Sequence, residues 1–173
     1  EEALRCVQAR GQYMQKAVPE GSGAMAAVLG LPDDKVELIC AQTVGETQVL
    51  APVNYNAPGQ VVIAGHAEAV DAVIPVLKEA GAKRVLKLPV SVPSHCALMQ
   101  WASEQLTGYM RDLTWYEPQV PVVQNVDAQI HHSIEEIQHC LSQQLYSPVR
   151  WVDCVNHLKT QGVTTLLECG PGK

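Results

Sequence analysis

The order of strand-like and helix-like segments across residues 24–90 restricts the possible folds more than any other feature of this sequence. Four short apolar runs bounded by glycine, proline and asparagine predict buried strands, and two stretches with apolar residues at spacings of three and four predict helices. In chain order these segments are strand, helix, strand, strand, helix and strand, at residues 24–30, 32–44, 48–54, 61–64, 67–80 and 84–90.

This order is typical of the split β-α-β arrangement, in which two helices cover one face of an antiparallel sheet. The second helical segment supports it, because Val70, Val73 and Leu77 fall on one face and Gly81 ends the pattern. The sequence therefore predicts a ferredoxin-like (βαββαβ) small subdomain over residues 24–90.

The flanking residues 1–23 and 91–173 follow a different pattern. Helices are predicted over residues 2–17, 95–113, 133–145 and 148–161, and apolar strands over residues 121–125 and 164–169. In the first helix, Leu4, Val7, Gly11 and Met14 form the expected buried stripe. Helices that alternate with apolar strands are typical of a parallel α/β sheet, but two strands are too few for a sheet that is stable alone. These flanks are therefore interpreted as a partial α/β subdomain, and the chain as part of something larger.

Charge and composition exclude several classes of protein. The 173 residues carry a formal net charge of -6, which argues against binding to nucleic acid or to an anionic membrane. No apolar run approaches the ~18–20 residues that a membrane span needs. The six cysteines are scattered through an apolar chain, and they predict reduced thiols in a cytoplasmic protein.

His95 is the first candidate for catalysis, because it follows a predicted strand and the turn Pro93-Ser94 and begins the next helix. Such junctions hold the backbone firmly while the side chain faces a cleft. A neutral imidazole there could act as general base toward a hydroxyl or a thiol. A capping or packing role for this histidine is the alternative.

Arg10 borders the predicted stripe of the first helix, between Val7 and Met14. An arginine that leans inward needs an anion, which a protein side chain or the carboxylate of a ligand can supply.

Gln144 lies where one helix ends and Ser147-Pro148 begins another, so its free carbonyl could orient a histidine N–H. A plain helix corner explains the same pattern.

Two weaker clusters complete the candidates. Lys83, Arg84 and Lys87 form the one compact basic group, which could dock an acidic partner or line a solvated end of the sheet. His131, His132 and His139 with Cys140 are interpreted as the solvated start of a helix, so no metal and no cofactor are expected.

Six segments together resemble the malonyl-CoA:acyl carrier protein transacylases of bacteria, in the order and with the spacing of that family. They are residues 10–15 (RGQYMQ), 23–28 (GAMAAV), 54–66 (NYNAPGQVVIAGH), 90–99 (VSVPSHCALM), 144–149 (QLYSPV) and 168–173 (ECGPGK).

The resemblance implies an acyltransferase of type II fatty-acid synthesis. A serine activated by histidine would take the malonyl group from malonyl-CoA and pass it to the phosphopantetheine thiol of acyl carrier protein. His95 matches the family's base, Arg10 the residue that binds the malonyl carboxylate, and Gln144 the residue whose carbonyl orients the histidine. The family's architecture is an α/β-hydrolase-like part with an inserted ferredoxin-like part.

The sequence departs from the family above all in lacking a Gly-x-Ser-x-Gly elbow to carry the nucleophile. The family's glutamine-bearing N-terminal segment and the stretch after the Gly-Pro-Gly-Lys turn are also missing from it. The chain is therefore predicted to form no acyl-enzyme by itself. Two alternatives are an acyltransferase domain of a polyketide synthase and a non-catalytic ferredoxin-like binding module. Convergence of His95 and Arg10 on one cleft would favour an enzyme over a binding module.

Overall fold

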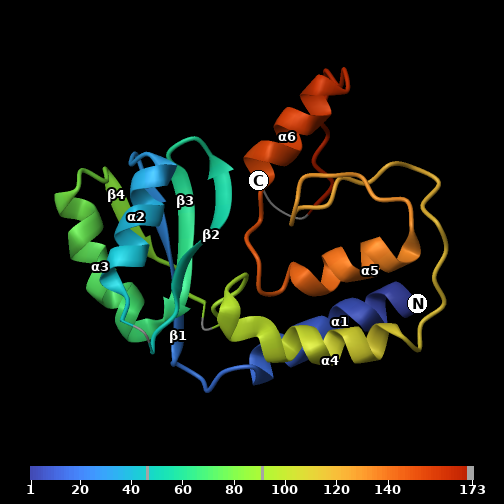
Figure 1. The fold of residues 1–173 in the computed structure, drawn as a ribbon, viewed down its shortest axis with the longest axis horizontal. Coiled ribbons are helices and arrows are strands. Elements are labelled where there is room, and N and C mark those ends of the chain that lie inside the picture. Colours follow the sequence, from blue (N-terminus) through green and yellow to red (C-terminus); the bar gives the residue numbers. More distant parts are fainter. Residues whose placement is uncertain (46, 91, 171–173) are drawn as a thin grey trace.

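The computed structural model describes residues 1–45, 47–90 and 92–170 (Figure 1). Its helices and strands are α1 (Glu2–Lys16), β1 (Gly23–Leu29), α2 (Asp33–Thr43), β2 (Leu50–Ala57), β3 (Gln60–His66), α3 (Ala67–Glu79), β4 (Arg84–Lys87), the 3-10 turn η1 (Ala97–Met99), α4 (Gln100–Met110), α5 (Ile134–Gln143) and α6 (Trp151–Thr160). Among these residues, none of the helices has both the length and the apolar character needed to cross a bilayer.

The four strands form one sheet in the order β2-β3-β1-β4, and every neighbouring pair is antiparallel. The six elements between Gly23 and Lys87 follow the order predicted from the sequence. Strand β1 lies inside the sheet, pairing along its whole length with β3 and over Ala26–Leu29 with β4. The antiparallel sheet predicted for this region is thereby confirmed.

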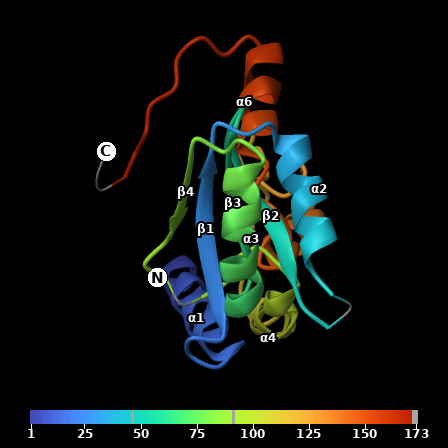
Figure 2. The same cartoon turned by 90° about the vertical axis from the view of Figure 1, so that its left-hand side faces the viewer.

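Helices α2 and α3 cover one face of the sheet (Figure 2). Alternate β1 residues Ala24, Ala26 and Val28 point into this core, because successive strand residues face opposite sides. Leu77 of α3 and Val36 of α2 are fully buried against them. Each such aliphatic side chain contributes about 1.5–3 kcal/mol when it leaves water.

The opposite face of the sheet packs against the segment that follows β4. Met25, Val53 and Val62 form a second buried cluster with Cys96 of that segment. A Cβ atom on Gly23 would lie 2.4 Å from the ring of Pro93, so only glycine permits this close approach. The sheet thus fixes the backbone on both sides of residue 95.

A helical layer lies beyond this segment, where α1 packs along α4 (Figure 1). Its core contains Met14, Met99, Leu106 and Leu145, and Met99 and Leu145 are completely buried. The predicted stripe of α1 is wrong at three of its four residues, because Leu4 and Val7 are 76% and 66% exposed and Gly11 is exposed too, while Met14 is buried. The packed stripe runs through Cys6, Tyr13 and Ala17, the face of the helix that meets α4.

Two of the predicted strands do not form. Residues 121–125 make a single antiparallel bridge, Val123 to Ile130, and residues 164–169 are exposed and irregular. A strand is stable only when a neighbouring backbone satisfies its N–H and C=O groups. The described residues offer neither segment such a neighbour, and apolar sequence alone does not create one.

Candidate active site

His95 lies in a turn between the sheet and the helical layer. Its backbone φ is 66°, in the left-handed region that non-glycine residues enter at a cost of about 1–2 kcal/mol. Two buried residues that follow His95 hold this turn between the layers. Cys96 packs in the sheet cluster, and Met99 packs in the helical core. The packing of these two residues therefore stabilises a left-handed backbone conformation that a loosely packed loop would not maintain.

Two consecutive carbonyls at the end of α5 hold His95. Its backbone N–H donates to Leu145 O at 2.9 Å, and its ring Nδ1 lies 2.6 Å from Gln144 O. A carbonyl only accepts hydrogen bonds, so the neutral ring carries its proton on Nδ1. Nε2 therefore keeps a free lone pair and can accept a proton.

The carbonyl of Gln144 is available because α5 ends one residue earlier. Gln144 is the C-terminal cap, and the last carbonyls of a helix have no partner within it. The amide Nε2 of Gln144 donates to the carbonyls of Ser147 and Pro148, at 2.9 and 3.3 Å. These bonds fix the corner between α5 and α6, and with it the direction of the carbonyl that meets His95.

Arg10 lies on α1, partly buried, and it forms no ion pair among the described residues. Burial lowers the pKa of its guanidinium, which marks an environment unfavourable to an uncompensated charge. Arg10 and Gln144 both line a cavity of about 430 Å³, together with Cys6, Leu106, Met110 and Leu113. A planar cation in a largely apolar cavity is suited to binding a carboxylate bidentately.

Burial, the Gln144 carbonyl and the charge of Arg10 all act on the pKa of His95. Burial lowers the pKa of His95, the Gln144 carbonyl opposes that shift, and the positive charge of Arg10 reinforces it. The net shift is downward, so the ring is neutral at pH 7. Arg10 and Gln144 thus line one cavity, and His95 is not among its lining residues. The histidine is linked to that cavity through its contact with the Gln144 carbonyl and through the charge of Arg10.

The basic group lies elsewhere, at the edge strand β4 of the sheet (Figure 1). Lys83, Arg84 and Lys87 are exposed, and Lys87 Nζ forms an ion pair with Asp71 of α3 at 2.7 Å. These residues do not line the cavity of Arg10.

Two groups near this site were not identified from the sequence. The carbonyl of Leu145 and the thiol of Cys6 carry no motif of their own, since one is a backbone atom and the other a partly buried side chain. Pro171, Gly172 and Lys173, of the motif at residues 168–173, lie outside the described residues.

Comparison with known proteins identifies the family. Residues 1–171 match the acyl transferase domain family. The chain is 51% identical over 172 residues to the malonyl CoA-acyl carrier protein transacylase of Escherichia coli, covering 99% of this chain and 55% of that protein.

Solved structures agree with this match. A malonyl-CoA:acyl carrier protein transacylase from Xanthomonas oryzae pv. oryzae superposes with a TM-score of 0.94 at 51% identity, over 96% of this chain and 53% of that chain. A malonyl-transacylase in complex with a type II polyketide-synthase acyl-carrier protein gives 0.96 at 50% identity, over 99% and 55%. The chain thus spans about half the length of the relatives it matches, and it belongs to the acyl transferase domain family.

Proposed function

We propose that this chain is part of an acyltransferase that moves a malonyl group from malonyl-CoA to the phosphopantetheine thiol of acyl carrier protein. The observation that carries the proposal is the ring of His95, whose Nδ1 lies 2.6 Å from the Gln144 carbonyl and whose pKa responds to the charge of Arg10. The names of the E. coli and X. oryzae relatives support the substrate and the carrier.

The proposed reaction has two half-reactions with one base. Nε2 of His95 takes the proton of a serine hydroxyl as its oxygen attacks the malonyl thioester, and the C–S bond breaks. The imidazolium returns this proton to the departing thiolate of coenzyme A. In the second half, Nε2 deprotonates the carrier's thiol, which attacks the acyl ester, and the serine oxygen regains the proton.

Arg10 supplies selectivity in this scheme. The malonyl group differs from an acetyl group by a free carboxylate. A partly buried guanidinium that makes no ion pair with any residue the structure describes is suited to binding it. The cavity's apolar lining reduces competition from water for these hydrogen bonds. Gln144 acts on the reaction through His95, as a positioning residue.

The basic group Lys83, Arg84 and Lys87 is our proposed docking point for the acidic carrier protein. Its exposure on an edge strand supports this role, although Lys87 already faces Asp71.

The superposition with a transacylase bound to a polyketide carrier favours a second candidate carrier, one of type II polyketide synthesis. Transfer rates to the two kinds of carrier would distinguish these pathways.

We also propose that residues 24–90 are a ferredoxin-like small subdomain inserted into an α/β-hydrolase-like part, to which residues 1–23 and 91–173 contribute. The strand order β2-β3-β1-β4 supports the first assignment. A cytoplasmic location is consistent with six cysteines that form no disulfide.

The experiment is Arg10→Ala in the full-length protein, assayed with malonyl-CoA and with acetyl-CoA. Two charge-assisted hydrogen bonds at about 1.5–3 kcal/mol each predict a loss of about 10²- to 10⁴-fold in kcat/KM for malonyl-CoA. Transfer of acetyl groups, which lack the carboxylate, should not fall.

The matched control is Arg5→Ala, since Arg5 lies on the same helix and forms an exposed ion pair with Glu1. Exposed pairs contribute little, so kcat/KM should stay within about twofold. Equal losses with both acyl donors, or equal losses in both variants, would contradict the role of Arg10.

A further inference from the structure

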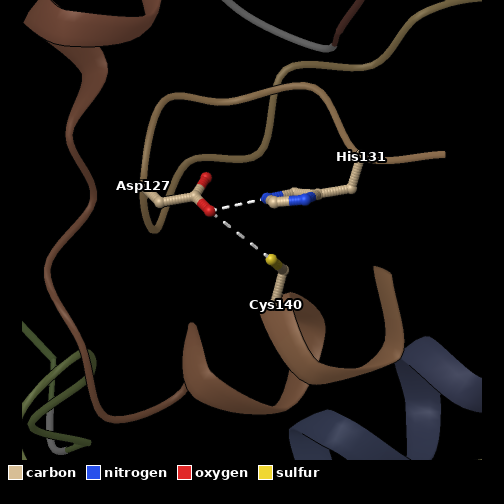
Figure 3. Close-up of side chains that lie close together, drawn as sticks. All are labelled: Asp127, His131 and Cys140. Atoms are coloured by element: carbon tan, nitrogen blue, oxygen red, sulfur yellow. Dashed lines mark hydrogen bonds and ion pairs between the residues drawn. The ribbon is translucent and has the colours of Figure 1, made fainter. Parts of the chain in front are cut away.

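Three side chains of different chemistry meet on the far side of α5 from Arg10's helix (Figure 3). Asp127 and His131 come from the irregular segment before α5, and Cys140 comes from α5 itself. The histidine Nε2 lies 2.7 Å from Asp127 Oδ2, and the cysteine Sγ lies 3.8 Å from the same oxygen. All the potential ligand atoms lie within 4.8 Å of one another.

The geometry points to a site for a divalent transition-metal ion, with zinc the best match, bound by Asp127, His131 and Cys140. Zinc prefers thiolate, imidazole and carboxylate ligands in a tetrahedral arrangement. Metal bonds of about 2.0–2.3 Å would place the oxygen and nitrogen about 3.3 Å apart, and the oxygen and sulfur about 3.6 Å apart. The observed 3.8 Å between oxygen and sulfur is close to this separation. The observed 2.7 Å between oxygen and nitrogen is a direct hydrogen bond, about 0.6 Å shorter, so these two groups would move apart by that amount to admit the ion.

Residues that contact the proposed ligands support the assignment of a metal site. Histidine ligands of metals usually donate their second ring N–H to a carboxylate, which sets the ring's orientation. The Nδ1 of His131 faces Glu136 Oε2 at 3.7 Å, within ion-pair distance but too far for a hydrogen bond, and Ser133 Oγ donates to that oxygen at 2.9 Å. Asp127 is oriented too, because its Oδ1 accepts the backbone N–H of Gln129 at 3.0 Å and leaves Oδ2 for the metal.

The spacing of histidines in the sequence did not identify this site. His132 and His139 are exposed and stand outside the cluster, and Asp127 enters it only because the chain folds back before α5. A bound ion would tie this segment to α5. The next turn of that helix leads to Gln144, whose N–H bonds Cys140 O at 2.9 Å and whose carbonyl holds His95.

The test is a titration of the full-length, metal-free protein with Co²⁺, followed by absorption spectroscopy. One equivalent should produce a thiolate-to-cobalt charge-transfer band and the d–d bands of a four-coordinate ion, in which water is the fourth ligand beside the three side chains. Zn²⁺ should then displace Co²⁺, because zinc favours four-coordinate tetrahedral sites with sulfur and nitrogen ligands. Zn²⁺ should also raise the melting temperature of the wild-type protein.

Four variants make the assignment specific. Cys140→Ser should abolish the charge-transfer band, whereas the matched control Cys154→Ser, at a buried cysteine of α6 outside the cluster, should keep it. His131→Gln should weaken binding at least tenfold, and Glu136→Gln by about 10- to 100-fold.

Absence of the band in the folded wild-type protein would overturn the proposal, and so would a band that survives Cys140→Ser. Should Cys140→Ser fail to fold by circular dichroism, His131→Gln decides the question. Unchanged affinity in that variant would refute the site.

Discussion

Leu145 and Leu77 offer a matched pair for testing how the helical core supports His95. Both leucines are 0% exposed, but Leu145 packs in the cluster of α1 and α4, while Leu77 packs under the sheet. The carbonyl of Leu145 also accepts the backbone N–H of His95 at 2.9 Å. Truncating each side chain to alanine removes the same three carbon atoms from two different cores.

The two substitutions should cost similar free energies of unfolding. Three buried carbons at about 0.8 kcal/mol each give about 2.4 kcal/mol, and the cavities left behind bring the total to about 2.7–5 kcal/mol. Their effects on the site should differ. Leu145→Ala loosens the residue that holds His95, so water enters and the depressed pKa of His95 rises toward its ordinary value.

Urea denaturation measures the first quantity, and NMR titration of the His95 ring protons measures the second, both in the full-length protein. In Leu77→Ala the pKa of His95 should equal that of the wild type. An unchanged pKa in Leu145→Ala, or an equal rise in both variants, would refute the claim that this core controls the histidine.

Two further predictions concern the same region. Because burial holds the pKa of His95 below 6.5, the unfolded chain binds the proton first as the pH falls. The contribution of His95 to stability should therefore be constant above about pH 7.5 and should decline as the pH falls through about 6.5 to the folded pKa. Urea denaturation from pH 5 to 8 checks this, and His95→Gln should flatten the slope; equal slopes would contradict it. Separately, Ser103→Ala should cost about 1 kcal/mol, since buried Ser103 Oγ donates to Ser142 O at 2.8 Å. The exposed control Thr160→Ala, which loses a bond to His157 O, should change the free energy of unfolding by less than about 0.5 kcal/mol, and equal losses would count against the buried link.

The sheet and its two helices could be predicted because their signals are local. Apolar residues such as Val70, Val73 and Leu77 repeat at helical spacing, and glycines and prolines mark the ends of each segment. The helix end at Gln144 could also be read locally, since the end of a helix leaves carbonyls free wherever it occurs, but only the family resemblance gave that carbonyl the role of orienting a histidine. The structure places the Gln144 carbonyl 2.6 Å from the ring Nδ1 of His95.

The remaining features depend on which segments become neighbours. Residues 121–125 and 164–169 have the composition of strands, but in the described structure they have no strand to pair with. In α1, Leu4 and Val7 carry the apolar signal, yet α4 approaches through Cys6 and Tyr13. Asp127 meets Cys140 across thirteen positions of chain, and no spacing rule connects an aspartate to a cysteine at that distance.

The end of α5 also has an electrical consequence for His95. Aligned peptide dipoles give the C-terminus of a helix a partial negative charge, which stabilises a nearby cation by about 0.3–1 kcal/mol and up to about 2 kcal/mol when partly buried. The carbonyls of Gln144 and Leu145 bring that charge to the imidazole, whereas burial and Arg10 favour its neutral form. In the proposed reaction the ring must accept a proton and then release it, twice in each cycle. These opposed influences keep the neutral and the protonated imidazole close in free energy, so each proton transfer remains readily reversible.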